Sequence, residues 1–342
     1  MTITTHMSRE IAEIPQAVAR LLDQGRAGFA AAGAALRDKD PAFLVTIARG
    51  SSDHAAHFIK YAVELQVGRP VASLGPSIAS VYKTDMRFSG GAAIAISQSG
   101  KSPDIVAMAD AATRAGAVTI ALTNTIDSPM AAACQHALDI AAGPELAVAA
   151  TKSYVNSVVA GLAMLSEWTG DNELCRAVAA LPEHLQRAVE LEWDELAMAL
   201  GGTESLYMLG RGPALAIAGE AALKFKETSE VHAEAYSAAE VLHGPVALVN
   251  SSFPVILFAA RDAAEPSVVE VADRLADKGG LVFATSDKVT KARPLPYIAT
   301  GHPLTDALAL IAPFYVFVEA FSRSRGFNPD QPAALKKVTE TR

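Results

Sequence analysis

The strongest constraint on the fold is a strand, a polar loop and a helix that follow one another repeatedly along the chain. Short apolar runs at residues 43–48, 92–96, 117–123 and 137–142 each end in small or polar residues, and helical patterns follow. Parallel strands require a crossover of a dozen or more residues between them, which is usually a helix. The alternation therefore predicts an α/β protein with parallel sheets.

The same succession then restarts in the second half of the chain. Residues 205–227 resemble residues 43–65, and residues 252–286 resemble residues 91–124. The two Arg-Gly pairs that follow the first strand of each half lie 162 residues apart. We predict two tandem flavodoxin-like domains, each a parallel sheet flanked by helices and joined to the other by helical residues 171–200. The expected boundaries are a helical lead-in (1–24), a first domain (25–170), a second domain (195–325) and a C-terminal tail (326–342).

Composition narrows the function classes. Hydrophobic residues make up 51% of the chain and charged residues only 19%, as expected for strands buried on both faces. The net charge of −8 argues against nucleic-acid binding. Cys134 and Cys175 are too few for a disulfide framework or a cysteine-rich zinc site. No uncharged run reaches the ~20 residues of a membrane span, and charges at Arg9, Glu10 and Glu13 interrupt any secretory leader. We expect a cytoplasmic protein without a membrane partner, metal or cofactor.

A run of hydroxyl residues at 97–102, Ser-Gln-Ser-Gly-Lys-Ser, is a candidate phosphate loop. It follows an apolar run and precedes a helix that Ser102 could cap, with Pro103 in the favoured first position. Amides and the dipole at a helix start attract anions, and Gly100 allows close approach. The spacing is not that of a P-loop, and an ordinary turn with a helix cap would use the same residues. The second copy, at 258–266, lacks the hydroxyls, so we expect one phosphate site per chain.

Two segments of the second half carry candidate acid–base groups. Lys224 and Glu227 are three residues apart, hence on one face of a helix. A solvated helical ion pair is the ordinary explanation, but the apolar flanks favour a partly buried helix. His243 precedes Gly-Pro and is expected on a loop beside a strand at 246–249, where a histidine often has no chemical role.

Four segments together resemble one family. They are residues 96–104 (ISQSGKSPD), 144–154 (PELAVAATKSY), 222–249 (ALKFKETSEVHAEAYSAAEVLHGPVALV) and 330–340 (DQPAALKKVTE). The chain resembles the sugar isomerase (SIS) domain family from about residue 8 onward. Within that family it is similar to the isomerase half of glutamine–fructose-6-phosphate aminotransferase and to the stand-alone glucosamine-6-phosphate deaminases.

The resemblance implies a binding site for a hexosamine 6-phosphate or fructose 6-phosphate. Its phosphate contacts would be Ser97, Gln98, Ser99 and Ser102. Ser52, after the first strand, would contact the sugar, and the backbone near Val148 and Ala149 would line the pocket.

The resemblance also implies four catalytic residues. Glu227 would move a proton between C1 and C2, and Lys224 would stabilise the charge that develops. His243 would assist ring opening at a neighbouring subunit's site, which implies a homodimer. Lys337 would close over the sugar and could form a Schiff base with the open ketose.

Several positions depart from the aminotransferase pattern. Residue 2 is Thr where the synthase has its nucleophilic cysteine, and we expect no glutaminase within this chain. Lys101 stands in place of Glu, Ala150 in place of Ser, and Ala333-Ala334 in place of Arg-Asn. The implied reaction is the conversion of glucosamine 6-phosphate to fructose 6-phosphate and ammonia. The alternatives are a fructosamine-phosphate deglycase, another amino-sugar-phosphate isomerase or aminotransferase, and a non-catalytic sugar-phosphate sensor.

Overall fold

The chain forms two compact units in a computed structural model, which describes residues 4–332, 335 and 337. Of the described residues, the first-sheet unit comprises 16–145, 152–179 and 337. The second-sheet unit comprises residues 4–15, 146–151, 180–332 and 335. The predicted boundaries at 25–170 and 195–325 remain predictions, although each sheet falls within one of those spans.

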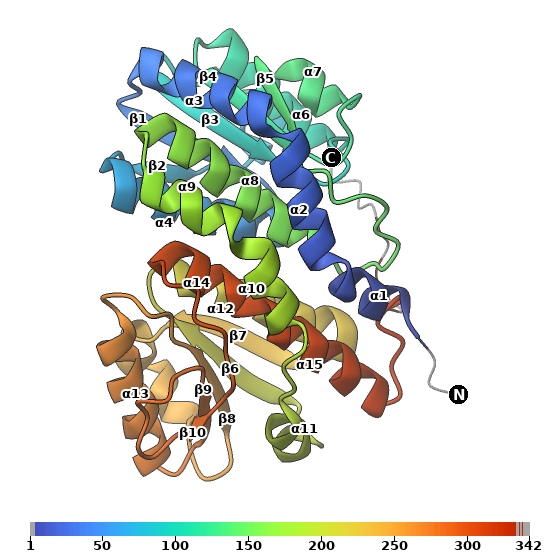
Figure 1. Cartoon of the computed structure of the whole chain (residues 1–342), viewed down its shortest axis with the longest axis vertical. Coiled ribbons are helices and arrows are strands. Elements are labelled where there is room, and N and C mark those ends of the chain that lie inside the picture. Colours follow the sequence, from blue (N-terminus) through green and yellow to red (C-terminus); the bar gives the residue numbers. More distant parts are fainter. Residues whose placement is uncertain (1–3, 333–334, 336, 338–342) are drawn as a thin grey trace. The chain divides into compact units, whose positions relative to one another are not determined.

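The first-sheet unit is built on a five-stranded, wholly parallel sheet (Figure 1). Its strands are β1 (Phe43–Ile47), β2 (Val71–Ser73), β3 (Gly91–Ile96), β4 (Val118–Thr123) and β5 (His136–Asp139). They are ordered β2-β1-β3-β4-β5. The chain therefore leaves β1 toward one edge and later returns to its other side, which places the topological switch point between β1 and β3.

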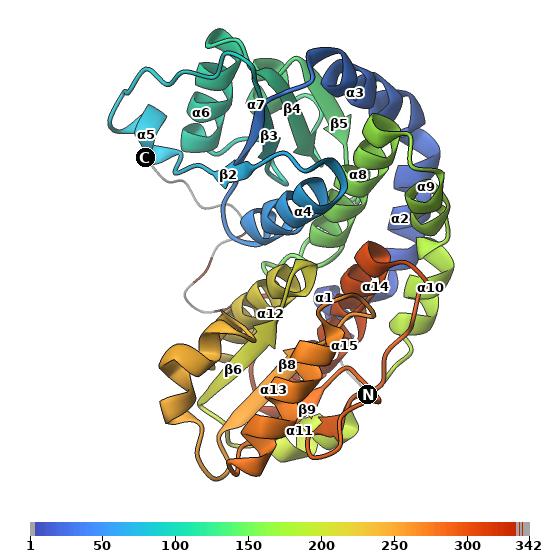
Figure 2. The same cartoon turned by 90° about the vertical axis from the view of Figure 1, so that its left-hand side faces the viewer.

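Helices cover both faces of this sheet, as burial of a parallel sheet requires (Figure 2). One face carries α3 (Arg26–Lys39), α4 (Ser51–Val67) and α8 (Lys152–Thr169). The other carries α5 (Ser77–Ser80), α6 (Pro103–Arg114) and α7 (Pro129–Ala133). Most of α2 (Ile14–Gln24) and all of α9 (Asn172–Ala179) also belong to this unit. Alanine-rich β3 is buried along its whole length, so helices approach the sheet closely.

The second-sheet unit repeats this topology. Its parallel strands are β6 (Ser205–Gly210), β7 (His232–Ser237), β8 (Pro254–Phe258), β9 (Leu281–Ala284) and β10 (Arg293–Pro294). Their order, β7-β6-β8-β9-β10, is the order of the first sheet. The turns after β1 and β6 also coincide: Gly50 has φ 56° and ψ −134°, and Gly212 has φ 61° and ψ −139°. The predicted fold class, two tandem parallel α/β domains, is confirmed.

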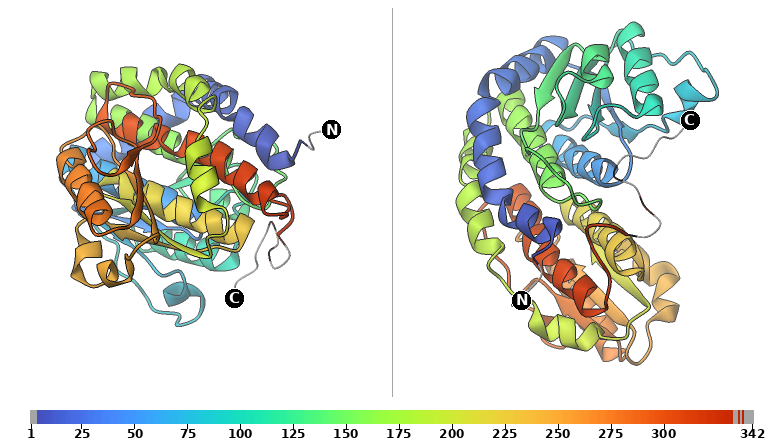
Figure 3. Two further views of the ribbon diagram at one scale, coloured as in Figure 1. Left: turned by 90° about the horizontal axis from the view of Figure 1, so that it is seen from below. Right: turned by 90° about the vertical axis from the view of Figure 1, so that its right-hand side faces the viewer.

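Helices surround the second sheet (Figure 3). They are α1 (His6–Ala12), α10 (Leu181–Ala188), α11 (Asp194–Leu200), α12 (Pro213–Ser229), α13 (Glu265–Asp277), α14 (Pro303–Ala309), α15 (Ile311–Ser324) and the 3-10 turns η1 (Glu240–His243) and η2 (Pro245–Leu248). Of these, α12 contacts β6, β7 and β8, α13 contacts β8 and β9, and α1 contacts α15. Residues 303–324 are long and apolar enough to cross a bilayer, but 89% of an 18-residue apolar window within them is buried in the fold, as in a core helix.

Three local expectations differ from the structure. The strand expected at 246–249 is wrong, because η2 occupies it after Gly244, whose φ of 143° favours glycine. The helix that we expected after the apolar run at 137–142 begins only at Lys152. Strand β7 was not expected, since HAEAYS is half-polar and lies at a sheet edge, where one face stays accessible.

Candidate functional site

The hydroxyl loop of residues 97–102 joins β3 to α6 at the carboxyl end of the first sheet. Its backbone is fixed to the end of β4: the Ser97 amide donates to the Leu122 carbonyl at 3.1 Å, and the Asn124 amide donates to the Gln98 carbonyl at 3.1 Å. The loop is thus an extension of the sheet rather than a free turn, so its donors are held in place before any ligand arrives.

Gly100 makes the tight turn of this loop. Its φ is +61°, and a Cβ there would lie 2.1 Å from the Ser128 hydroxyl oxygen, so only glycine fits. The Gly100 amide donates to the Ser97 hydroxyl at 3.2 Å, and the Lys101 amide donates to the Ser99 hydroxyl at 3.4 Å. Both hydroxyls therefore accept from the backbone, and their own hydrogens remain free to point at an anion.

The start of α6 differs from the expected cap. Ser102 is the N-cap residue and Pro103 follows in the first turn, as predicted, but the Ser102 side chain makes no capping hydrogen bond. Asp104 supplies the acceptor instead, since its Oδ1 accepts from the Ile105 amide at 2.9 Å. The expectation that Ser102 caps the helix through its side chain is therefore wrong.

Arg49 connects the β1 loop to the start of α6. Its Nε and Nη2 lie 3.2 Å and 3.0 Å from Oδ2 of Asp104. The Asp104 side chain is 2% exposed and that of Arg49 is 50% exposed. Ser52 lies in the first turn of α4, two residues beyond Gly50. Because β1 and β3 are neighbours, Ser52, Arg49 and the hydroxyl loop flank the switch point, where ligands of such sheets bind.

Lys337 lies in the same unit and forms an ion pair with Glu145. Its Nζ is 3.1 Å from Oε2 of Glu145, whose side chain is fully buried. Glu145 also accepts from the amide and the hydroxyl of Ser153 at 3.0 Å and 2.6 Å. The Schiff-base role of Lys337 remains a prediction, and Ala333-Ala334 lie outside the described residues.

Val148 and Ala149 belong to the second-sheet unit, in an irregular segment that leads toward α8. The Val148 amide donates to the Asp330 carbonyl at 3.3 Å. The buried Glu10 carboxylate accepts from the preceding Ala147 amide at 3.3 Å. The Glu10 side chain of α1 and the Asp330 carbonyl of the C-terminal region thus hold this segment in place.

The acid–base candidates meet on α12. Lys224 is completely buried, and its amine forms an ion pair with Glu227, whose side chain is 20% exposed. A second carboxylate, the fully buried Glu220, lies 3.4 Å from the same amine and accepts from the Tyr315 hydroxyl at 2.9 Å. Burial opposes the charge on Lys224, but the two carboxylates outweigh it and raise the pKa of its amine above the ordinary value.

His243 lies elsewhere in the second-sheet unit. It ends the 3-10 turn η1 and is exposed, directly before the sharp turn at Gly244. Its expected role at a neighbouring subunit remains a prediction.

Several site residues were missed at the sequence level. Glu220 could have been found, since it precedes Lys224 by one helical turn. The Arg49–Asp104 pair and the Lys337–Glu145 pair join residues 55 and 192 positions apart, which no local pattern reveals. No group of three histidine, cysteine or acidic residues suited to a metal occurs in the described part of the chain.

The second copy fills the equivalent loop with its own charges. Arg261 follows β8 at the position of the hydroxyl loop, and its Nε lies 3.4 Å from Asp306 and 3.7 Å from Glu265. Its Nη2 donates to the Thr285 carbonyl at 2.8 Å. A phosphate would have to displace this network, which supports the expectation of one phosphate site per chain.

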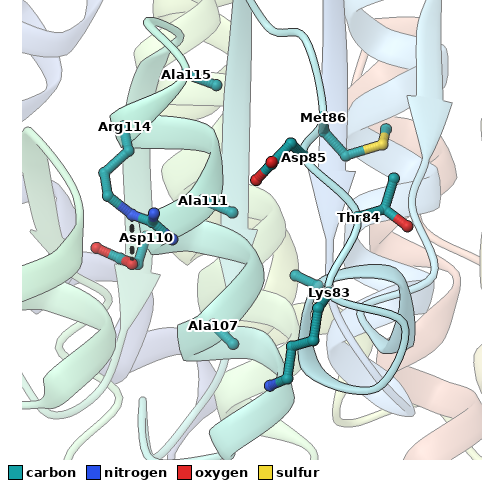
Figure 4. Close-up of a pocket in the computed structure, with 10 residues that line it drawn as sticks. Lys83, Thr84, Asp85, Met86, Ala107, Asp110, Ala111, Arg114 and Ala115 are labelled. Atoms are coloured by element: carbon teal, nitrogen blue, oxygen red, sulfur yellow. Dashed lines mark hydrogen bonds and ion pairs between the residues drawn. The ribbon is translucent and has the colours of Figure 1, made fainter.

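A cavity of about 480 Å³ lies apart from the hydroxyl loop, on the C-terminal half of α6 (Figure 4). One face of α6 and the segment of residues 83–86 lie on opposite sides of this cavity. Asp110 and Arg114, both on α6, form an ion pair at 2.9 Å. The charged groups of the cavity are of both signs, and none of the predicted site residues lines it.

Comparisons with known proteins identify a domain family that matches the chain twice, once over each sheet. The family model described as the SIS domain matches residues 37–167 and 200–292. A glutamine–fructose-6-phosphate aminotransferase (isomerizing) from Methanothermobacter thermautotrophicus is 32% identical over 305 residues, covering 85% of this chain and 50% of the relative. The chain thus spans about half the length of that relative.

Two solved structures share nearly the whole fold. A candidate phosphosugar isomerase from Silicibacter pomeroyi DSS-3 is 55% identical, with a TM-score of 0.93 over 96% of this chain and 100% of its own. A glucosamine-6-phosphate deaminase from Thermotoga maritima is 19% identical, with a TM-score of 0.78 over 98% of this chain and 100% of its own. At that identity the second likeness shows the fold alone.

Proposed function

Because this chain belongs to the SIS domain family, we propose that it is a phosphosugar isomerase that acts on an amino sugar. The reaction is the conversion of glucosamine 6-phosphate to fructose 6-phosphate and ammonia. The 55% identity to a candidate phosphosugar isomerase supports the isomerase part of this proposal. The release of ammonia is what the resemblance to the stand-alone glucosamine-6-phosphate deaminases implies.

The observation that carries the proposal is the uneven burial of the ion pair on α12. An ordinary helical ion pair lies in solvent and contributes ~0.3–0.5 kcal/mol. Here Lys224 is completely buried between Glu220 and Glu227, and only Glu227 reaches the surface. A buried cation that presents one accessible carboxylate suits proton transfer at carbon, since the cation stabilises charge on a bound substrate.

The chemistry follows from these positions. The open-chain amino sugar loses its C2 proton to the Glu227 carboxylate, which exchanges it in part with solvent and then delivers a proton to C1. The intermediate enolamine becomes the imine of fructose 6-phosphate, which water hydrolyses to the ketone and ammonia. Lys224 stays protonated throughout, because Glu220 retains a second contact with its amine.

Binding groups are assigned to the same reaction. Ser97, Gln98, Ser99 and Ser102 hold the phosphate, and Ser52 contacts the sugar across the switch point. Val148 and Ala149 line the pocket through their backbone. For Lys337 to reach an open ketose, its ion pair with Glu145 must first break.

Assembly and location belong to the proposal as well. A homodimer lets the exposed His243 assist ring opening at the partner's site. The location is the cytoplasm, which is consistent with two cysteines that are both free.

The test is a panel of hexosamine 6-phosphates and fructosamine phosphates, with ammonia and fructose 6-phosphate measured separately. We expect equimolar ammonia and fructose 6-phosphate from glucosamine 6-phosphate. Release of a free amino acid from a fructosamine phosphate would indicate a deglycase instead. Isomerisation without ammonia would indicate another phosphosugar isomerase, and tight binding without turnover would indicate a sensor.

A further inference from the structure

The hydroxyl loop adjoins a buried negative charge, the Asp104 carboxylate, whose ion pair is with Arg49 and not with Lys101 of the loop itself. The Asp104 carboxylate is 2% exposed and lies two residues after Ser102, at the very start of α6. It accepts from the Ile105 amide, so it already satisfies part of the helix dipole that was expected to attract an anion. A nearly buried negative charge at this position repels a phosphate dianion that enters the adjacent loop.

We propose that Arg49 is a positioning residue that neutralises the buried Asp104 carboxylate, so that the 97–102 loop can accept a phosphate dianion. This inference rests on the proposed function, because it assumes that the loop binds a phosphate. Two guanidinium nitrogens of Arg49 approach one carboxylate oxygen at 3.0 Å and 3.2 Å, and they do so from the loop after β1. The guanidinium therefore balances the charge of Asp104 from the loop after β1, without lying within the hydroxyl loop itself.

The second copy provides an internal comparison. Arg211 follows β6 in the position of Arg49, but it donates to a neutral partner, the Ser267 hydroxyl on α13, at 3.2 Å. The buried Glu265 at the start of α13 is instead balanced by Lys288 and Arg261. In both copies a cation from another strand's loop contacts the carboxylate, Arg49 after β1 and Lys288 after β9. Only in the second copy does a cation inside the loop between strand and helix, Arg261, contact it as well, and only the first copy has hydroxyls in that loop.

The experiment measures binding of inorganic phosphate by calorimetry and the KM and kcat for glucosamine 6-phosphate. The variants are Arg49→Met, Asp104→Asn, the double variant, and Arg211→Met as the matched control. We expect Arg49→Met to weaken phosphate binding and raise KM at least roughly tenfold, with kcat within about twofold, because it leaves a buried charge without its partner. The double variant removes both charges and should recover most of the affinity. Arg211→Met should bind phosphate like the wild type.

The outcomes separate this inference from its alternatives. If the double variant binds phosphate as weakly as Arg49→Met, Arg49 contacts the ligand directly and charge balance is not its role. If Arg49→Met binds phosphate like the wild type, the ion pair serves the fold alone. The double variant carries no unpaired charge, so it remains informative even if Arg49→Met fails to fold. If the wild type binds phosphate but does not turn over glucosamine 6-phosphate, the proposed function is refuted and this inference stands. If the wild type does not bind phosphate, this inference is refuted.

Discussion

Glu227→Gln is the sharpest test of the acid–base pair on α12. The substitution keeps the shape of the side chain and removes its charge, so it eliminates a base while leaving a hydrogen-bond acceptor for Lys224. A positioned general base contributes about 10²- to 10⁴-fold to a rate. We therefore expect ammonia release and exchange of the C2 proton with solvent to fall at least 10²-fold.

The stability change can be worked out from the same contacts. Removing one partner of a buried ion pair costs roughly 3–5 kcal/mol when the other charge is left alone. Lys224 is not left alone, since Glu220 lies 3.4 Å from its amine. The loss should therefore be closer to the ~1.5–3 kcal/mol of a single hydrogen bond to a charged group, and the variant should fold and bind sugar phosphate nearly as the wild type does.

Glu319→Gln is the matched control. Glu319 is a buried acidic residue of the same unit, and it pairs with Arg323 on α15 at 2.8 Å. Its replacement should lower the free energy of unfolding by a similar amount and leave proton exchange unchanged. Deuterium incorporation at C2, followed by NMR, measures the exchange, and thermal unfolding measures stability. Exchange at the wild-type rate in Glu227→Gln would refute its catalytic role.

Four further predictions follow from other parts of the chain. Replacing Ser97 and Ser99 by Ala should raise KM roughly tenfold for each lost hydrogen bond to a charged group, with much less effect on kcat in steady-state assays. Slight burial opposes the charge on Asp273, but hydrogen bonds from residues 290–292 lower its pKa to about 2. The contribution of Asp273 to the free energy of unfolding should therefore be full above pH ~4 and fade as the pH falls toward 2. Asp273→Asn should remove that pH dependence in urea titrations. Burial raises the pKa of the Cys134 thiol to about 11, whereas Cys175 is exposed, so one thiol per chain should react rapidly with a thiol reagent at pH 8, as followed by mass spectrometry. Light scattering should give twice the chain mass of 35.7 kDa, and a fully active particle of single-chain mass would contradict the dimer.

The sheets were predictable because buried parallel strands are almost continuously apolar. Strand β3 (GAAIAI) and strand β8 (PVILF) are fully buried and stand out in any reading of the sequence. Strand β7 was not recognisable in the sequence, because an edge strand can alternate polar and apolar residues, and HAEAYS resembles a loop as much as a strand. The tandem order of elements then supplied the topology, which the matching strand orders confirm.

The site was predictable only where its chemistry is local in sequence. The hydroxyl loop and the Lys224–Glu227 spacing are short motifs, so the residues that form them could be selected without a structure. The hydrogen-bond acceptor at the start of α6 could not be predicted, since Ser102 and Asp104 both offer an acceptor and only the backbone geometry decides between them. The ion pairs of Arg49 with Asp104 and of Glu145 with Lys337 could not be predicted either, because each contact depends on how distant segments fold together.

The comparison of the two copies explains why a duplicated fold keeps only one candidate phosphate site. Each copy buries a carboxylate at the start of the helix after its third strand, and each must balance that charge. In the second copy the balancing Arg261 lies inside the loop, where it also stacks on Tyr297 with its guanidinium carbon 3.8 Å from the ring centre. A cation placed there occupies the position that a ligand would need. In the first copy Arg49 supplies that charge from the loop after the neighbouring strand, and the 97–102 loop keeps its hydroxyl and amide donors together with the exposed Lys101. The two copies therefore differ in where an arginine lies. Arg261 is inside the loop of the second copy, whereas Arg49 lies after the neighbouring strand in the first copy, where we propose that the loop binds an anion.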